Sequence, residues 1–220
     1  MKLFKKIITA VLSVCCLVGA TACGGGGGDS SSIKMEANFE YNDYLGTGYN
    51  KEMCYQNHGL VQAADPSVIT VGDTFYMYAT NANEEGDCSY IQGWQSKNLS
   101  DWTPMGNVFV PKRDSWAVHS LWAPEVIKKG DTYYMYYSGY NISTGKMGIG
   151  LATSSSPNGP FKEIEGTYGG KTYSHTKMPI DLGFKAIDAS PFIDDDGKIY
   201  LYVSKDQVDR VSSVYACELE

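Results

Sequence analysis

Three segments of the chain share one pattern of hydrophobic and polar positions. Each has a pair of β-branched or apolar residues, a turn centred on Gly-Asp or Asp-Gly, and then aromatic residues at alternate positions. This pattern around a glycine turn is typical of β-hairpins. The segments are PSVITVGDTFYMY (66–78), PEVIKKGDTYYMY (124–136) and SPFIDDDGKIYLY (190–202), at offsets of 58 and 66 residues.

A further strand is predicted after each of the first two hairpins, in SYIQGWQS (89–96) and KMGIGLATS (146–154), and each leads toward a fourth. Each unit then holds four short antiparallel strands over roughly sixty residues. Radial repetition of four-stranded sheets is a β-propeller, so we expect an all-β fold. A β-sandwich is the competing architecture, although it does not require a repeat at this spacing.

The first 22 residues have the features of an export signal. A basic start is followed by a short apolar run that ends in small residues before Cys23. A cysteine after small residues resembles a bacterial lipoprotein processing site, which would make Cys23 the lipidated first residue of the mature chain. An ordinary secretory signal remains the alternative. We expect an exported protein, either a cell-surface lipoprotein or a secreted one.

A glycine- and serine-rich stretch follows the signal. Residues 23–32 (CGGGGGDSSS) predict a lipidated cysteine on a flexible tether, because Gly/Ser tracts behave as coil. The folded domain is then expected at 33–220. Its acidic balance, a net charge of −7 for the whole chain, argues against nucleic-acid binding, which needs a basic patch. The 17 tyrosines suit carbohydrate contacts, but they suit a β-rich core equally well.

Cysteine usage does not indicate a disulfide framework. Once the signal is removed and Cys23 carries lipid, three cysteines remain, at Cys54, Cys88 and Cys217. An odd number allows one bridge at most, such as Cys54–Cys88.

Five short motifs, in order along the chain, carry a resemblance to glycoside hydrolase family 43. They are ADPSV (64–68), SKNLSDW (96–102), LWAPEV (121–126), SSSPNGPF (154–161) and IDASPFIDDDGKIYLYV (187–203). The resemblance implies a five-bladed β-propeller. It also implies inverting hydrolysis of arabinose- or xylose-containing plant polysaccharides or oligosaccharides. Three repeats fit into this chain, so we expect it to hold roughly the first three blades and to be truncated at its C-terminus.

The resemblance also implies roles for two aspartates. Asp65 corresponds to the general base, and Asp188 to the residue that orients the acid and tunes its pKa. Inverting hydrolysis requires a carboxylate base and a carboxylic acid on opposite sides of the sugar. The general acid, a glutamate in the family, is expected beyond the end of this chain. Taken alone, Asp65 would be read as an ordinary turn acid at the start of a strand.

Two further residues are candidates for substrate binding. Trp122 would provide a platform for a sugar ring, and Glu125 would bond sugar hydroxyls. A core aromatic and a strand-start acid are the respective alternatives. Neither the histidines nor the acidic run at 194–196 has metal-ligand spacing, so we expect no metal site and no cofactor. The resemblance leaves room for a structural cation such as calcium, which this sequence does not support.

The expected partners are a glycan substrate and, through the lipid anchor alone, a membrane. A non-catalytic glycan-binding lipoprotein is the alternative function, because the expected acid is absent from the chain. A fructan-cleaving relative with the same propeller is a third candidate. ADPSV lacks the asparagines that such enzymes usually place beside the Asp-Pro pair.

Overall fold

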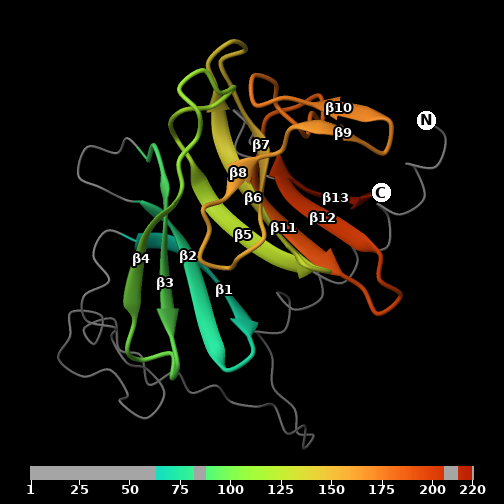
Figure 1. Ribbon diagram of the computed structural model, residues 1–220. Coiled ribbons are helices and arrows are strands. Elements are labelled where there is room, and N and C mark those ends of the chain that lie inside the picture. The colour runs from blue at the N-terminus through green and yellow to red at the C-terminus, as the bar shows by residue number, and fades with distance from the viewer. Residues whose placement is uncertain (1–62, 82–87, 206–212, 220) are drawn as a thin grey trace, which may run out of the picture. The chain divides into compact units, whose positions relative to one another are not determined.

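The computed structural model describes residues 63–81, 88–205 and 213–219 (Figure 1). These residues form strands and no helix, which confirms the all-β prediction. The described part of the chain accordingly offers no helix with the length and hydropathy needed to cross a membrane. The strands are β1 (Ala63–Val71), β2 (Thr74–Asn81), β3 (Ile91–Ser96), β4 (Thr103–Phe109), β5 (Trp122–Lys129), β6 (Thr132–Asn141), β7 (Lys146–Ser154), β8 (Lys162–Glu163), β9 (Gly166–Tyr168), β10 (Lys171–Tyr173), β11 (Ala186–Ile193), β12 (Ile199–Lys205) and β13 (Ser213–Leu219).

The strands form repeated antiparallel sheets. The first sheet has the order β1-β2-β3-β4, the second β5-β6-β7-β8 and the third β11-β12-β13. A separate hairpin, β9-β10, lies between the second and third sheets in the chain. Each main sheet is a meander in which neighbours in the sequence pair with one another. The four-stranded unit predicted from the sequence is therefore present twice, and the third sheet has three strands in the described part of the chain. Closure into five blades stays a prediction.

The predicted turns connect the first two strands of each sheet. Gly72 and Gly130 open two-residue turns with φ of 63° and 58°, values that a glycine adopts without steric cost. The third hairpin has a longer turn, because Ile193 pairs with Ile199. In the strand before the turn, Ser190 therefore occupies the place of Glu125, an offset of 65 residues. In the strand after the turn, Tyr202 occupies the place of Tyr136, and only there does the offset of 66 hold.

The first strand of every sheet has a β-bulge at the same place. Two residues of β1, Asp65 and Pro66, oppose one residue of β2, since the register shifts between Ala64 and Ser67. The same shift occurs in β5 between Trp122 and Glu125, and in β11 between Ile187 and Ser190. A bulge leaves a residue unpaired, so a proline without an N–H is tolerated there.

Two clusters of buried side chains join the sheets. The first lies between the first and second sheets, where Tyr78, Phe109 and Tyr137 are almost completely buried. The second lies between the second and third sheets and includes Ile149 and Leu201. The innermost strands β1, β5 and β11 accordingly lie side by side, with β5 between the other two (Figure 1).

Several sequence predictions concern residues outside the described part of the chain. These are the signal at 1–22, the lipidated Cys23 with its tether at 23–32, and Cys54. Within the described residues, Cys88 and Cys217 are free thiols. The buried Cys88 thiol donates a hydrogen bond to the backbone oxygen of Asn81, at 3.0 Å between Sγ and O.

Candidate active site

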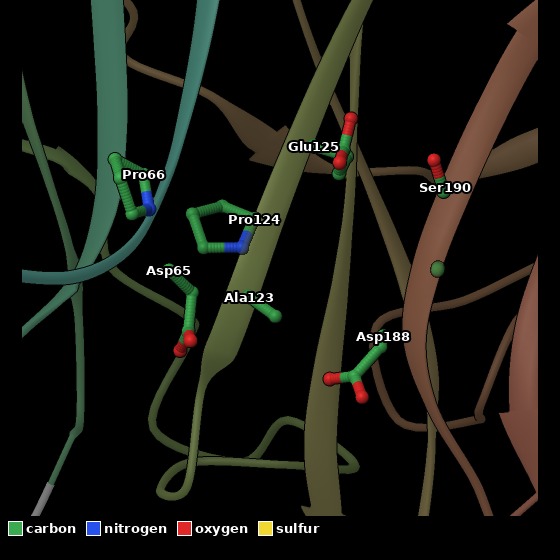
Figure 2. A pocket seen from close by; sticks show the side chains of 8 residues that line it. Asp65, Pro66, Ala123, Pro124, Glu125, Asp188 and Ser190 are labelled. Atoms are coloured by element: carbon green, nitrogen blue, oxygen red, sulfur yellow. The ribbon is translucent and has the colours of Figure 1, made fainter. Parts of the chain in front are cut away.

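The three bulges surround one pocket. Its volume is about 240 Å³, and every lining residue belongs to β1, β5 or β11 (Figure 2). The lining residues are Asp65, Pro66, Ala123, Pro124, Glu125, Asp188, Ala189 and Ser190. The fold therefore brings together three of the four candidate site residues, Asp65, Glu125 and Asp188, although Asp65 and Asp188 are 123 positions apart in the sequence.

The bulge sets the direction of the Asp65 side chain. Asp65 has a φ of 50°, in the left-handed region that aspartate tolerates better than most residues. Its carboxylate oxygen Oδ2 accepts a hydrogen bond from the Thr80 hydroxyl, at 2.9 Å from Oγ1. Figure 2 shows the Asp65 and Asp188 carboxyl groups at the same end of the pocket, on either side of Ala123.

Asp188 occupies the equivalent position in the third sheet. Its φ is 54°, close to that of Asp65. Its backbone N–H donates a hydrogen bond to the Ser138 hydroxyl on β6, at 2.9 Å between N and Oγ. The second sheet therefore holds the strand segment that carries Asp188.

Ala123 is the third member of this set, in the second sheet. It has a φ of 46°, and its N–H donates to the Thr80 hydroxyl at 2.8 Å. Because its side chain is a methyl group, the space between the two aspartates stays open. Asp65, Ala123 and Asp188 are thus three copies of one position, of which two carry carboxyl groups.

Glu125 lies at the other end of the pocket. In Figure 2 it lies beside Ser190 and beyond Pro124, away from the two aspartates. Burial raises the pKa of the Glu125 carboxyl above its ordinary value, because the charged form loses contact with water. At this position Glu125 is better placed to contact a bound molecule inside the pocket than to take part in proton transfer beside the two aspartates.

Trp122 directly precedes Ala123 but does not line the pocket itself. Its side chain is 37% exposed, which differs from the core aromatic that the sequence left as an alternative. A partly exposed indole next to the pocket leaves a face for a sugar ring, so its role as a platform stays a prediction.

The pocket is acidic. None of its described lining residues is basic, and it contains three carboxyl groups. Across residues 63–81, 88–205 and 213–219, no group of three or more His, Cys, Asp or Glu side chains could hold a metal ion. Paired carboxyl groups that face a common space can take a proton from water or hold a neighbouring acid protonated.

Two residues of this site, Thr80 and Ala123, were not predicted from the sequence. The repeat offset was the available signal, because Ser138 follows Thr80 by 58 residues and Ala123 follows Asp65 by the same number. These matches become informative only when the structure shows the same bulge in β1 and β5, which places Ser138 at the position of Thr80 and Ala123 at the position of Asp65.

Repeated antiparallel meanders around a shared pocket define a class of all-β proteins whose function depends on the residues at the site. The model of one family, "Glycosyl hydrolases family 43", matches residues 60–220. The chain belongs to this family.

Known relatives match part of the chain. "Probable arabinan endo-1,5-alpha-L-arabinosidase A" of Aspergillus flavus is 34% identical over 148 residues, covering 64% of this chain and 42% of the relative. "Extracellular endo-alpha-(1->5)-L-arabinanase" of Thermotoga petrophila is 28% identical, with coverage of 62% and 32%. "Xylosidase/arabinosidase 43A" of Humicola insolens is 26% identical, with coverage of 64% and 43%. The chain thus spans less than half the length of each of these relatives.

A solved structure supports the fold. The chain is similar to "a thermostable family-43 glycoside hydrolase", with a TM-score of 0.61 and 31% identity. The similarity covers 76% of this chain and 52% of that one.

Proposed function

We propose that the protein is an inverting glycoside hydrolase, with Asp65 as its general base. The observation that supports this most directly is the pairing of Asp65 and Asp188. In a family 43 chain, they occupy equivalent bulges and face one pocket. The matching bulges give each carboxyl group a direction that a surface turn acid would not need.

The proposed reaction uses water as the nucleophile. Asp65 takes a proton from a water molecule whose oxygen bonds to the anomeric carbon, and the glycosidic C–O bond breaks. The leaving oxygen takes its proton from a carboxylic acid on the opposite side of the sugar. In this proposal Asp188 tunes that acid, because a nearby negative charge keeps a carboxylic acid protonated to a higher pH.

The proposed substrates are arabinan- and xylan-type glycans. The support is the set of names that the relatives bear, which include arabinanases and a xylosidase/arabinosidase. An acidic pocket without basic lining residues suits a neutral sugar better than an anionic one. The five-bladed propeller remains part of this proposal.

We also propose that the protein is exported and anchored at the cell surface by lipid on Cys23. The support is the signal-like start of the chain and the extracellular relative. Incorporation of labelled palmitate that is lost in Cys23→Ala would agree with the anchor. Equal labelling of both proteins, or no labelling of the wild type, would contradict it.

An Asp65→Asn variant tests the proposed reaction in the full-length protein. Asparagine adopts left-handed backbone conformations as readily as aspartate, so the bulge should survive. We expect turnover of linear arabinan, nitrophenyl arabinofuranoside or nitrophenyl xyloside to fall at least about 100-fold, the usual scale of a general base. The melting temperature should change little.

Two results would contradict the proposal. If Asp65→Asn kept its activity, Asp65 would not be the base. If the wild-type protein bound arabinan without cleaving any of the three substrates, the glycan-binding lipoprotein would be the better description.

A further inference from the structure

The sheets are tied to one another by a repeated hydroxyl group. Thr80 on β2 and Ser138 on β6 occupy the same register position, opposite Ala64 and Trp122 respectively. Each hydroxyl accepts the backbone N–H of the left-handed residue in the next sheet. These residues are Ala123 for Thr80 and Asp188 for Ser138. The contact is therefore a property of the repeat and recurs with it.

The Thr80 hydroxyl differs from its copy because it also binds a carboxylate. The Ala123 N–H can only donate, so it occupies a lone pair of the Thr80 oxygen. The single hydroxyl proton is then available for Asp65, whose Oδ2 lies 2.9 Å away. Among the described residues, Thr80 is the hydrogen-bond partner of the Asp65 side chain.

The surroundings restrict Thr80 to this arrangement. Its side chain is only 4% exposed, so little water reaches the hydroxyl. Threonine is also β-branched, which limits rotation about its first side-chain bond. Both hydrogen bonds lie within the 2.7–3.2 Å range of well-formed contacts.

We propose that Thr80 is a positioning residue for Asp65. It couples one carboxylate oxygen to the backbone of the neighbouring sheet and leaves the other oxygen for the water that reacts. This inference rests on the proposed role of Asp65 as the base. Thr80 would then act on the chemical step and not on the affinity for the glycan, since it does not line the pocket.

The test compares Thr80→Val with Thr80→Ser in the full-length protein. Valine has the shape of threonine without the hydroxyl, whereas serine retains the hydroxyl. We expect kcat on linear arabinan to fall about 10- to 100-fold in Thr80→Val, with KM within about twofold of wild type, because small errors in position cost this much. Thr80→Ser should retain kcat within about threefold.

Ser138→Ala provides the structural comparison. It removes the equivalent hydroxyl between the second and third sheets. Similar decreases in melting temperature for Thr80→Val and Ser138→Ala would measure how much stability is lost with the hydrogen bond between two sheets. The loss of stability in Thr80→Val can then be distinguished from its effect on kcat.

The outcomes separate this inference from the proposed function. An active wild type with unchanged kcat in Thr80→Val would overturn the positioning role alone. The same holds if KM rose in step with the loss of kcat, or if Thr80→Ser were as impaired as Thr80→Val. A wild-type protein that cleaves no substrate would overturn the proposed function and this inference with it.

Discussion

Three residues at the pocket have backbone conformations that residues other than glycine rarely adopt. Asp65, Ala123 and Asp188 have φ between 46° and 54°. Left-handed conformations in residues other than glycine typically cost about 1–3 kcal/mol and persist only where the surroundings impose them. Here the bulge and the hydroxyl contacts of Thr80 and Ser138 provide that constraint. Strain of this kind concentrates at functional sites, which agrees with the proposed role of the pocket.

Gly150 provides a test of packing at the scale of one residue. It pairs with Tyr137, and a methyl group at Gly150 would lie only 2.2 Å from the Tyr137 ring. Tyr137 is completely buried and cannot move aside easily. We expect Gly150→Ala to lower the free energy of unfolding by about 1–3 kcal/mol, as overpacked cores do. Denaturant unfolding followed by tyrosine and tryptophan fluorescence would measure this.

Gly148, on the same strand, is the matched control. A methyl group there would meet the Met178 side chain, whose terminal atoms can shift. Gly148→Ala should therefore cost less than Gly150→Ala. If the two variants were equally stable, the rigid contact with Tyr137 would not be the cause.

At the scale of elements, the hairpins could be predicted from the sequence and the bulges could not. A Gly-Asp turn between alternating aromatic residues specifies β1-β2 and β5-β6, because glycine adopts the backbone angle that the turn requires. A bulge depends on how two strands pair, which no single strand reveals. Pro66 and Pro124 are compatible with a bulge, but a proline at a strand start has the same appearance in the sequence.

His175 brings together three segments that lie between strands of the sheets. It lies after β10, and its Nδ1 contacts Glu165, between β8 and β9, while its Nε2 lies 3.2 Å from Asp114, between β4 and β5. The hydrogen bond with Glu165, followed by the close contact with the Asp114 carboxylate, raises the pKa of His175 above its ordinary value. Lys112, 3.4 Å from Nδ1, opposes the increase.

A pH-dependent loss of stability should follow from His175. Because its pKa is raised on folding, its contribution is fully present below its unfolded pKa of about 6.5 and is lost as the pH rises through the folded pKa. Asp114 and Glu165 have lowered pKa values, so their contributions are lost only in acid. We expect the melting temperature to fall as the pH rises above about 6.5.

A His175→Gln variant isolates this effect. Glutamine keeps polar atoms near Glu165 and Asp114 but does not titrate. Its melting temperature should be less dependent on pH over the same range. An equal dependence in both proteins would assign the effect to other groups.

At the scale of the molecule, the sheets share their hydrophobic core. Phe109 of the first sheet packs against Tyr137 of the second, with ring centroids 4.8 Å apart. The Tyr78 hydroxyl also crosses this boundary and donates to the backbone oxygen of Pro157 at 2.7 Å. We therefore expect the described sheets to unfold together.

Phe109→Ala tests this cooperativity. The truncation leaves a cavity between two sheets and should lower the free energy of unfolding by about 3–5 kcal/mol. Circular dichroism and intrinsic fluorescence should still report one transition at the same, lower temperature. Two separate transitions would show that the sheets unfold independently.

The candidate site was predictable in part. Asp65, Asp188 and Glu125 could be selected because they lie in recognisable motifs at the start of predicted strands. Thr80 could not, because its importance arises from an amide in another sheet, 43 residues away. Trp122 was chosen as a platform for a sugar ring, which stays a prediction, and only the fold shows that its side chain is partly exposed.

The methyl group of Ala123 has an electrostatic consequence. A strict copy of the repeat would place a third aspartate between Asp65 and Asp188, and mutual repulsion would force one of the three to take up a proton. The second sheet instead carries its carboxyl group two residues later, at Glu125, at the far end of the pocket. Divergence at one position thus leaves a pair of carboxyl groups where a threefold repeat would have produced a crowded triplet.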